Sequence, residues 1–287
     1  MNKKDFLIKP GASISLNKFR TSDTGGFKSK ADAEPILKKN IRKMFTLQNI
    51  LYAYDKYSVL IIFQAMDAAG KDGTIKHVMS GLNPQGTQVF SFKQPSAEEL
   101  DHDYLWRIHS HLPERGRIGI FNRSHYEEVL VVRVHDLING QKIPSDLLKG
   151  DIWQTRYREI NDFEKYLYEN GTIILKFFLH VSKEEQKKRL LKRIDTPGKN
   201  WKFSAADTDE RKYWDKYQQA YAEAISATSK KHAPWFIIPA DHKWYTRYAV
   251  SQVIVETLER IRMSYPVLSK EQLAVLDSYR KKLLDEK

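Results

Sequence analysis

A buried strand that leads directly into a turn of small residues ending in Gly-Lys constrains this chain more than any other feature. Residues 59–63 read Val-Leu-Ile-Ile-Phe, which is typical of a strand covered on both faces, and Gly70 and Lys71 follow after a short turn. Small side chains in this turn let successive N–H groups converge on phosphoryl oxygens at the start of a helix. The sequence therefore predicts a strand–loop–helix unit whose phosphate contacts come from Ala68, Ala69, Gly70, Asp72, Gly73 and Thr74.

This loop departs from the usual pattern G-x-x-x-x-G-K-[ST], because Ala65 replaces the first glycine and Asp72 replaces the hydroxyl residue that binds magnesium. Asp67 is a further difference, since bound phosphate would repel its carboxylate unless a cation lay between them. We therefore predict that Asp67 binds Mg²⁺, with Mn²⁺ as the alternative ion, and that Lys71 places a positive charge on the substrate. An ordinary glycine turn is the competing interpretation.

Short apolar runs that alternate with amphipathic stretches indicate an α/β protein. We expect strands at 59–63, 89–92, 118–121, 173–179 and 235–238, and helices at 34–54, 97–111, 125–138, 146–169, 183–194, 209–229, 242–263 and 268–284. This alternation predicts a central, mainly parallel sheet with helices on both faces, whose ligands bind beyond the carboxyl ends of the strands. We interpret residues 1–287 as a single domain, in which residues 1–33 wrap the surface.

Charge and composition narrow the possible partners. The chain has 48 Lys plus Arg residues against 36 Asp plus Glu residues, and the net charge of +12 favours a polyanion such as nucleic acid, an anionic membrane or polyphosphate. The absence of cysteine excludes disulfides and thiolate chemistry. No apolar run approaches the roughly 18 residues of a membrane span. We expect a cytoplasmic protein that does not bind membranes.

A second candidate segment, residues 121–128, follows another predicted strand. It contains Asn122, Arg123 and Glu127, which the parallel sheet would bring to the same edge as the phosphate loop. Arg123 is the expected clamp on the transferred phosphate, and Asn122 and Glu127 are predicted catalytic residues that also hold the metal. Asn122 and the serine after Arg123 are also residue types that cap helices, and capping is compatible with a catalytic role.

A third candidate segment, about 187–210, has the composition of a lid. A basic helix is interrupted at Pro197 and Gly198 and is followed by an aromatic and basic stretch. Arg189 and Arg193 are four residues apart, so they share a helix face and are predicted to contact a phosphate chain together with Lys202. For the other lysines of this helix, a solvated surface is the preferred interpretation.

Five ordered motifs together give the chain a recognisable pattern: residues 23–27, 66–74, 121–134, 201–204 and 233–244. The chain resembles the second family of polyphosphate kinases, which are phosphate-loop enzymes that transfer phosphate between inorganic polyphosphate and nucleotides. The resemblance covers nearly the whole sequence. It implies a three-layer α/β/α fold with a helical lid, magnesium dependence, and assembly into homodimers or homotetramers.

The resemblance also assigns residues. Asp67, Lys71 and Arg123 match the magnesium-binding aspartate, the loop lysine and the phosphate-contacting arginine of the family. The Asn122 and Glu127 pair resembles the subgroup that accepts both AMP and ADP. The implied reaction is reversible transfer of phosphate from polyphosphate to AMP and ADP, with guanine nucleotides as further acceptors and no nucleic-acid partner. In the family, basic residues lie near the nucleotide or the polyphosphate channel, and Arg133, Arg193 and Lys202 resemble these residues.

Two other functions remain open at this point. A nucleoside monophosphate kinase that uses ATP would share the loop, the lid and the fold, but Ala65 and Asp72 count against it. A non-enzymatic protein that binds polyanions or nucleic acid would explain the positive charge without chemistry. Magnesium-dependent nucleotide turnover distinguishes the enzymes from the binding protein.

Overall fold

One parallel sheet organises the molecule. The computed structural model describes residues 3–286, apart from the side chains of Lys3 and Lys202. The sheet has the order β2-β3-β1-β4-β5, and every neighbouring pair is parallel. The strands are β1 (Ser58–Gln64), β2 (Thr87–Ser91), β3 (Ile118–Asn122), β4 (Thr172–His180) and β5 (Trp235–Pro239). The predicted α/β class and the predicted parallel sheet are confirmed.

The central strand β1 is buried along its whole length, as its unbroken apolar run requires. Its last residues pair with those of its neighbours, Phe63 with Asn122 of β3 and Gln64 with Phe178 of β4. This register brings the end of β3 beside the loop that leaves β1.

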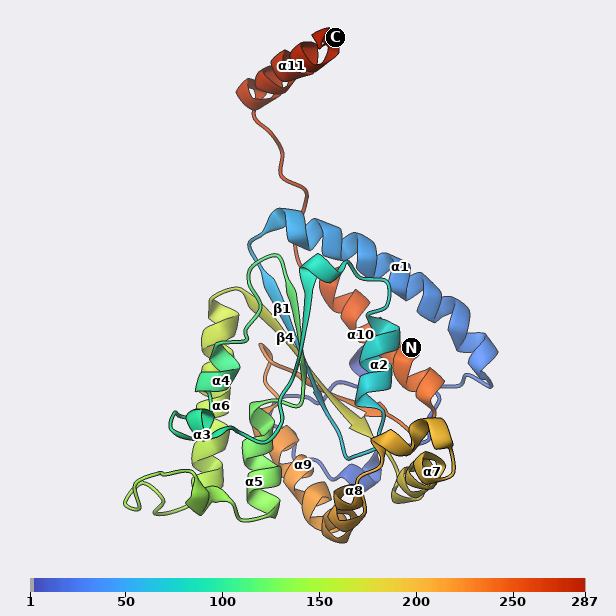
Figure 1. Ribbon diagram of the computed structural model, residues 1–287, viewed down its shortest axis with the longest axis vertical. Helices are drawn as coiled ribbons and strands as arrows, with labels where there is room; N and C mark the ends of the chain where they lie inside the picture. Colours follow the sequence, from blue (N-terminus) through green and yellow to red (C-terminus); the bar gives the residue numbers. More distant parts are fainter. Residues whose placement is uncertain (1–2, 287) are drawn as a thin grey trace.

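Helices cover both faces of the sheet (Figure 1). On one face α1 (Lys30–Tyr54) packs along α10 (Lys243–Leu258), which in turn packs on α2 (Lys71–Val78). On the other face α6 (Ile152–Glu169) packs against β4 and against α9 (Trp214–Thr228). The remaining helices are α3 (Ala97–Leu100), α4 (Trp106–His109), α5 (Val131–Val134), α7 (Lys183–Ile194), α8 (Ala205–Asp209) and α11 (Lys270–Asp285).

Two predicted helices are wrong as continuous elements. The stretch 97–111 contains only α3 and α4, because the Asp103 side chain accepts a hydrogen bond from the Leu105 N–H and forms a turn between them. The stretch 125–138 divides into the 3₁₀ helix η4 (His125–Val129) and α5, and a left-handed Asp136 (φ 53°) follows α5. The other 3₁₀ segments are η1 (Lys3–Asp5), η2 (Leu16–Lys18), η3 (Pro84–Gly86), η5 (Ile138–Gly140), η6 (Pro197–Lys202) and η7 (Glu210–Tyr213).

The two ends of the chain differ in how closely they pack on the sheet. Near the N-terminus, Phe6 and Ile8 are buried, and their backbone groups hydrogen-bond to β5 at Ile237 and Trp235. Near the C-terminus, α11 stands away from the sheet (Figure 1). Across residues 3–286, no helix combines the length and the apolar character needed to cross a bilayer.

Candidate active site

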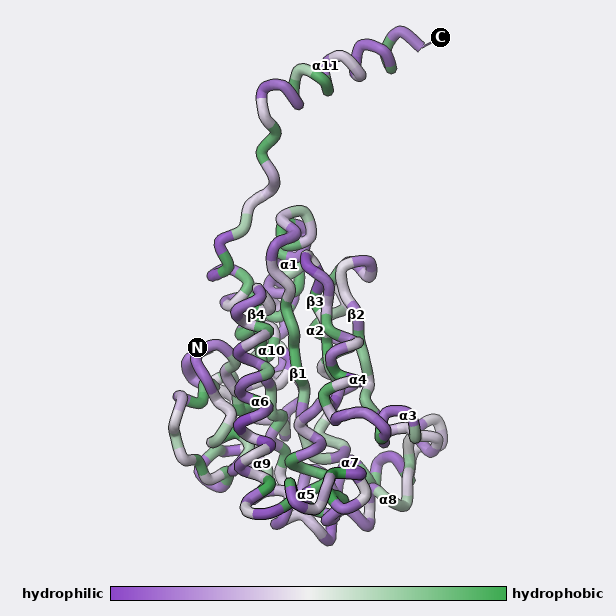
Figure 2. Tube along the Cα trace, turned by 90° about the vertical axis from the view of Figure 1, so that its left-hand side faces the viewer, coloured by the Kyte–Doolittle hydropathy of each residue, from purple (hydrophilic) through white to green (hydrophobic). Residues whose placement is uncertain are grey.

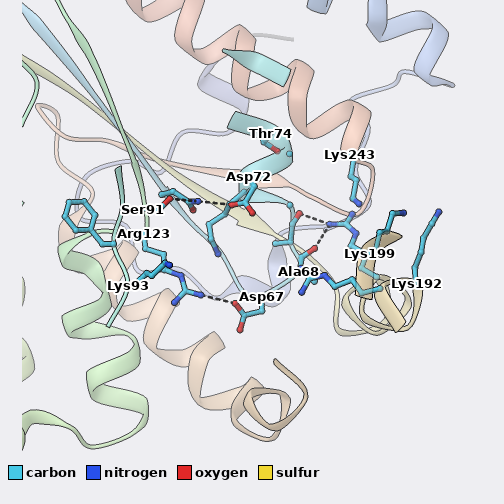
Figure 3. A pocket seen from close by; sticks show the side chains of 18 of the residues that line it. Asp67, Ala68, Asp72, Thr74, Ser91, Lys93, Arg123, Lys192, Lys199 and Lys243 are labelled. Atoms are coloured by element: carbon cyan, nitrogen blue, oxygen red, sulfur yellow. Dashed lines mark hydrogen bonds and ion pairs between the residues drawn. The ribbon is translucent and has the colours of Figure 1, made fainter. Parts of the chain in front are cut away.

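The predicted phosphate loop lies between β1 and α2, at the carboxyl edge of the sheet (Figure 3). Two of its residues adopt left-handed backbone conformations, Ala68 with φ 58° and Gly70 with φ 107°. Gly70 is the N-cap of α2, and a side chain at its φ would be strained. The loop therefore ends on the positive pole of α2, where backbone N–H groups bind anions.

Arg189 of α7 holds this loop in place. Its side chain is buried, and all five N–H donors of a guanidinium are matched by protein acceptors. The acceptors, at 2.6–3.2 Å, are the Glu185 carboxylate and the carbonyl oxygens of Ala68, Ala69, Ala240 and Asp241. These bonds fix the loop against the end of β5, four of them to the backbone and one to Glu185. Arg189 also lines the pocket described below, and its predicted contact with phosphate stays a prediction.

Lys71 lies at the start of α2, with its ammonium directed back over the loop. Its Nζ donates a hydrogen bond to the Ala65 carbonyl at 2.8 Å. Burial and the nearby charge of Arg123 lower the pKa of the Lys71 ammonium, although Asp67 acts in the opposite direction. The sequence placed Lys71 in the phosphate site, and the structure puts it in the wall of the pocket described below.

Arg123 and Asp67 both line this pocket and contact each other, as Figure 3 shows. The Arg123 Nη2 lies 3.3 Å from the Asp67 Oδ1, and 43% of the Arg123 side chain is exposed. Arg123 has a left-handed backbone with φ 66°, a strained conformation for a residue other than glycine and one that occurs often at active sites. The guanidinium retains N–H groups that are directed at the pocket and can bind a phosphate.

Asn122 connects the loop helix to the neighbouring strand. Its Nδ2 donates to the Asp72 carboxylate at 2.8 Å and to the Ser91 hydroxyl at 3.3 Å. Its Oδ1 is buried and has no hydrogen-bond partner among the described residues. An oxygen acceptor of this kind, in the same pocket as the Asp67 carboxylate, suits Mg²⁺, which takes one or two protein oxygens and completes its shell with water and substrate phosphates.

Glu127, the third predicted metal ligand, lies in η4 and is not among the residues that line the pocket. Burial raises the pKa of its carboxyl group, against the opposing charges of Arg123 and Lys71. Within residues 3–286 no cluster of three or more His, Cys, Asp or Glu side chains has the arrangement of a metal site. Glu127 therefore interacts electrostatically with Arg123 and Lys71, and its binding of a metal stays a prediction.

The pocket has a volume of about 620 Å³ and is strongly basic. It brings the predicted residues of the loop together with Asn122, Arg123, Arg189 and Arg193. Two acidic residues, Asp67 and Asp72, line the pocket. Its lining also contains nine basic residues: Lys71, Lys93, Arg123, Arg189, Lys192, Arg193, Lys199, Lys243 and Arg247. This excess of positive charge suits a ligand with several phosphates.

Sequence reasoning missed several of these residues. Lys93 and Gln94 follow the end of β2, and Lys243 and Arg247 lie in the first turns of α10 after β5. Because ligands bind beyond the carboxyl ends of parallel strands, the same rule that identified Arg123 after β3 identifies Lys93 and Lys243 when it is applied to the two outer strands. Figure 3 shows Lys93 and Lys243 on opposite sides of the loop.

The predicted lid consists of the end of α7, then η6 and α8. Arg193 of α7 forms an ion pair with Asp207 of α8 at 2.6 Å and also lines the pocket. Burial and the charge of Asp67 raise the pKa of the Asp207 carboxyl. Lys192, interpreted as a solvated lysine, lines the pocket as well. The predicted contact of Lys202 falls on a side chain outside the described part of the structure.

Arg133 lies apart from the other predicted substrate residues. It donates a hydrogen bond to the Tyr157 hydroxyl at 2.8 Å, pairs with Glu223 at 2.5 Å, and is absent from the lining of the pocket. The structure therefore joins Arg133 to α6 and α9, and it does not bring Arg133 together with Lys71 and Arg123.

A buried charged cluster lies behind η4. The Lys176 ammonium, in the middle of β4, donates to Glu164 at 2.5 Å and to the Tyr126 hydroxyl and the Thr228 carbonyl at 2.8 Å each. Tyr126, three residues after Arg123, also donates to Glu164 at 2.9 Å. These bonds connect η4 to β4, α6 and the end of α9, and so fix the segment that carries Arg123.

Comparisons with known proteins agree with this geometry. The model of the family described as "Polyphosphate kinase 2 (PPK2)" matches residues 27–265. An "ADP-polyphosphate phosphotransferase" of Rhodopseudomonas palustris is 52% identical over 98% of both chains, and an "AMP/ADP-polyphosphate phosphotransferase" of Meiothermus ruber is 47% identical over 92% of this chain and 95% of that one. The crystal structure of polyphosphate kinase 2 from Arthrobacter aurescens superposes with a TM-score of 0.89 and 38% identity, and covers 98% of this chain and 97% of its own. The chain therefore belongs to the polyphosphate kinase 2 family.

Proposed function

We propose that this protein transfers the terminal phosphate of inorganic polyphosphate to ADP and AMP, reversibly and with magnesium. The observation that carries the proposal is the basic pocket, in which nine cationic side chains surround a loop at the N-terminus of α2. The names of the two relatives described above support the choice of donor and acceptors.

In the proposed reaction, an oxygen of the nucleotide phosphate attacks the terminal phosphorus of the polyphosphate chain. The bridging P–O bond breaks, and the chain leaves one phosphate shorter. The attacking group is already an anion, so alignment and charge neutralisation carry the catalysis and no strong base is needed. Lys71 and the loop N–H groups hold the transferred phosphoryl group, and Arg123, which contacts Asp67 in the same pocket, neutralises its charge.

Asp67, with the amide oxygen of Asn122, would hold the magnesium ion, which neutralises phosphate charge when it is bound. On this proposal, Lys192, Lys199, Lys243 and Arg247 bind the donor chain on one side of the loop. Lys93 and Arg123 then face the acceptor on the other side (Figure 3). The proposal also includes use of guanine nucleotides, a cytoplasmic location and a dimeric or tetrameric assembly.

Product analysis tests the proposal directly. The purified protein is incubated with magnesium, long-chain polyphosphate and either AMP or ADP, and the nucleotides are separated. We expect ADP and ATP from AMP, and ATP from ADP. Asp67→Ala should abolish both, whereas Glu169→Ala, which removes an exposed carboxylate that pairs with Lys165 on the surface of α6, should not.

Each alternative gives a different result. Transfer from ATP to AMP without use of polyphosphate would favour a nucleoside monophosphate kinase. Polyphosphate binding that Asp67→Ala leaves intact, with no nucleotide turnover by the unmodified protein, would favour a binding protein.

A further inference from the structure

The acceptor side of the phosphate pocket is formed in part by a short piece of chain that follows β2. We call Phe92, Lys93 and Gln94 the acceptor-side segment; all three line the pocket. β2 is an edge strand of the sheet, and its pairing with β3 ends at Ser91 and Asn122. The Phe92 N–H still donates to the Asn122 carbonyl at 3.2 Å, and the chain then leaves the sheet. The position of Lys93 therefore depends on contacts from outside the sheet.

Arg107 supplies such a contact. It lies in α4, and Figure 2 shows α3 and α4 on the same side of the molecule as β2. The Arg107 Nη1 donates to the Lys93 carbonyl at 2.9 Å, and the guanidinium lies over the Phe92 ring, 5.4 Å from the ring centroid. Arg107 is only 6% exposed, so it makes these contacts away from water. It thus holds two consecutive residues of the acceptor-side segment.

Aromatic packing connects α4 to the strands that end at the pocket. His111, just after α4, packs edge-on against Phe90 and Phe92, with ring centroids 4.6 and 5.6 Å apart. Its Nδ1 lies 2.7 Å from the Arg107 carbonyl. Phe92 in turn packs edge-on against Phe121 of β3 at 4.9 Å. These contacts give α4 a defined position relative to β2 and β3, from which Arg107 can fix the segment.

The charge of Arg107 is directed at the protein and not at the ligand. Arg107 is absent from the lining of the pocket, and its Nη1 lies 3.4 Å from the Glu99 carboxylate. Burial opposes the change, but the Ser96 N–H and the charge of Arg107 lower the pKa of the Glu99 carboxyl, so Glu99 stays ionised and neutralises Arg107. Because apolar residues of similar volume are often as stable as a buried ion pair, packing alone does not account for this arginine.

We propose that Arg107 is a positioning residue of the acceptor site, which holds the Lys93 backbone so that the Lys93 ammonium faces the phosphate of the acceptor nucleotide. This inference rests on the proposed function, which assigns Lys93 to the acceptor side of the loop. A segment that is already fixed binds its ligand without the entropy cost of being ordered. Loss of Arg107 should therefore weaken binding of the acceptor and not of the donor chain, whose basic residues lie on the other side of the loop (Figure 3).

Steady-state kinetics of Arg107→Met test the proposal. Methionine keeps much of the buried volume and removes both the donors and the charge. We expect the KM for AMP and ADP to rise about tenfold, as when one residue must be ordered on binding, with kcat and the KM for polyphosphate within about twofold of wild type. Arg156→Met is the matched control, because Arg156 is 7% exposed and donates to Glu159 at 3.1 Å and to Gln141 at 2.9 Å. It breaks a similar buried pair and should leave the KM for AMP unchanged.

A double-mutant cycle shows whether Arg107 acts through Lys93. Lys93→Ala alone should raise the KM for AMP, and adding Arg107→Met to it should raise the KM little further. If the two effects instead multiplied, Arg107 would act by a route that does not involve Lys93, and the proposal would be wrong. Arg107→Lys keeps a positive charge beside Glu99 and is the second variant if Arg107→Met does not fold. An unchanged KM for AMP in every folded Arg107 variant would also overturn the proposal.

Direct binding of AMP separates this inference from the proposed reaction. Calorimetric titration with AMP, in magnesium and without polyphosphate, needs no turnover. A Kd for AMP about tenfold higher in Arg107→Met would support the inference even if the unmodified protein used another phosphate donor. Equal affinity of the wild type and Arg107→Met for AMP, or no binding of AMP by the wild type, would overturn it.

Discussion

The phosphate pocket and the buried cluster behind η4 both contain charged residues, but they differ in how many of the N–H donors are hydrogen-bonded to the protein. In the phosphate pocket, the Lys71 ammonium makes one hydrogen bond to the loop, and Arg123 remains 43% exposed. In the cluster behind η4, Lys176 is fully buried and all three of its N–H donors are matched by Glu164, Tyr126 and the Thr228 carbonyl.

The difference shows that residue type alone does not identify a binding site. Donors left open toward a cavity bind a ligand, whereas donors that the protein itself satisfies fix the position of a segment. Burial lowers the pKa of Lys176 to about 8 even with Glu164 beside it, so this ion pair is maintained against a large desolvation cost. Such a cost is consistent with a role in positioning rather than in binding.

The largest effect should come from breaking the buried pair. Lys176→Met leaves the Glu164 carboxylate buried without its cation, so we expect the free energy of unfolding to fall by about 3–5 kcal/mol in urea titration. Lys165→Met is the matched control, because it breaks an exposed pair with Glu169 and should cost less than about 1 kcal/mol. Adding Glu164→Leu to Lys176→Met removes the orphaned charge and should restore part of the loss. Equal losses for Lys176→Met and Lys165→Met would contradict a structural role for the cluster.

The next effect concerns the pocket. Lys71→Ala removes the cation at the loop, and we expect the rate of phosphate transfer to fall by about 10²–10³-fold, as when one donor to a developing charge is removed. Stability should change little, in contrast to Lys176→Met. Lys76→Ala, an exposed lysine on the same helix, should leave the rate unchanged. Normal turnover by a folded Lys71→Ala protein would remove Lys71 from the site.

Lys71 and Lys176 also show what could and what could not be predicted from the sequence. The pattern around Gly70 and Lys71 is local, so it predicted the loop and the start of α2 correctly, and Lys71 lies in the lining of the pocket. The function of Arg189 was not predictable, because its acceptors are carbonyl oxygens of Ala69 and Ala240, which are distant in sequence and come together only in the fold. Lys176 stands inside an apolar strand, where no local pattern indicates a partner twelve residues earlier on α6.

Asn122→Asp tests the acceptor side of the pocket. A carboxylate in place of the amide loses the hydrogen bond to Asp72 and adds a negative charge beside it. We expect a loss of about tenfold, or ~1.4 kcal/mol, in kcat/KM for AMP, and a smaller loss for ADP. Initial rates with the two acceptors, at the same polyphosphate concentration, measure the ratio. An unchanged ratio would show that Asn122 does not set acceptor preference.

The buried cluster should also respond to pH through His125, which lies 3.5 Å from Glu164. Burial lowers the pKa of His125 below its usual value of 6.5, despite the nearby Glu164. The native imidazole therefore stays neutral as the unfolded one takes up a proton, so the free energy of unfolding falls as the pH drops below 6.5, by at most about 1.4 kcal/mol per pH unit for one proton. His125→Phe should reduce this slope. The exposed His77→Ala is the control, and equal slopes for all three proteins would exclude His125 as a source of acid sensitivity.

The smallest effect should come from Arg133, whose donors resemble those of the buried cluster more than those of the pocket. It is held by Tyr157 and Glu223, with its guanidinium over the Trp153 ring. Arg133→Met keeps most of the packing volume, so we expect less than about a threefold change in kcat/KM, or ~0.7 kcal/mol, for either nucleotide. Arg123→Met is the comparison and should cost at least ten times more, because Arg123 faces the pocket. If Arg133→Met instead raised the KM for nucleotide as strongly as Arg123→Met, the bound nucleotide would have to extend to α6 and α9. Hydrogen bonds from an arginine to protein acceptors would then no longer indicate that the arginine does not bind the substrate.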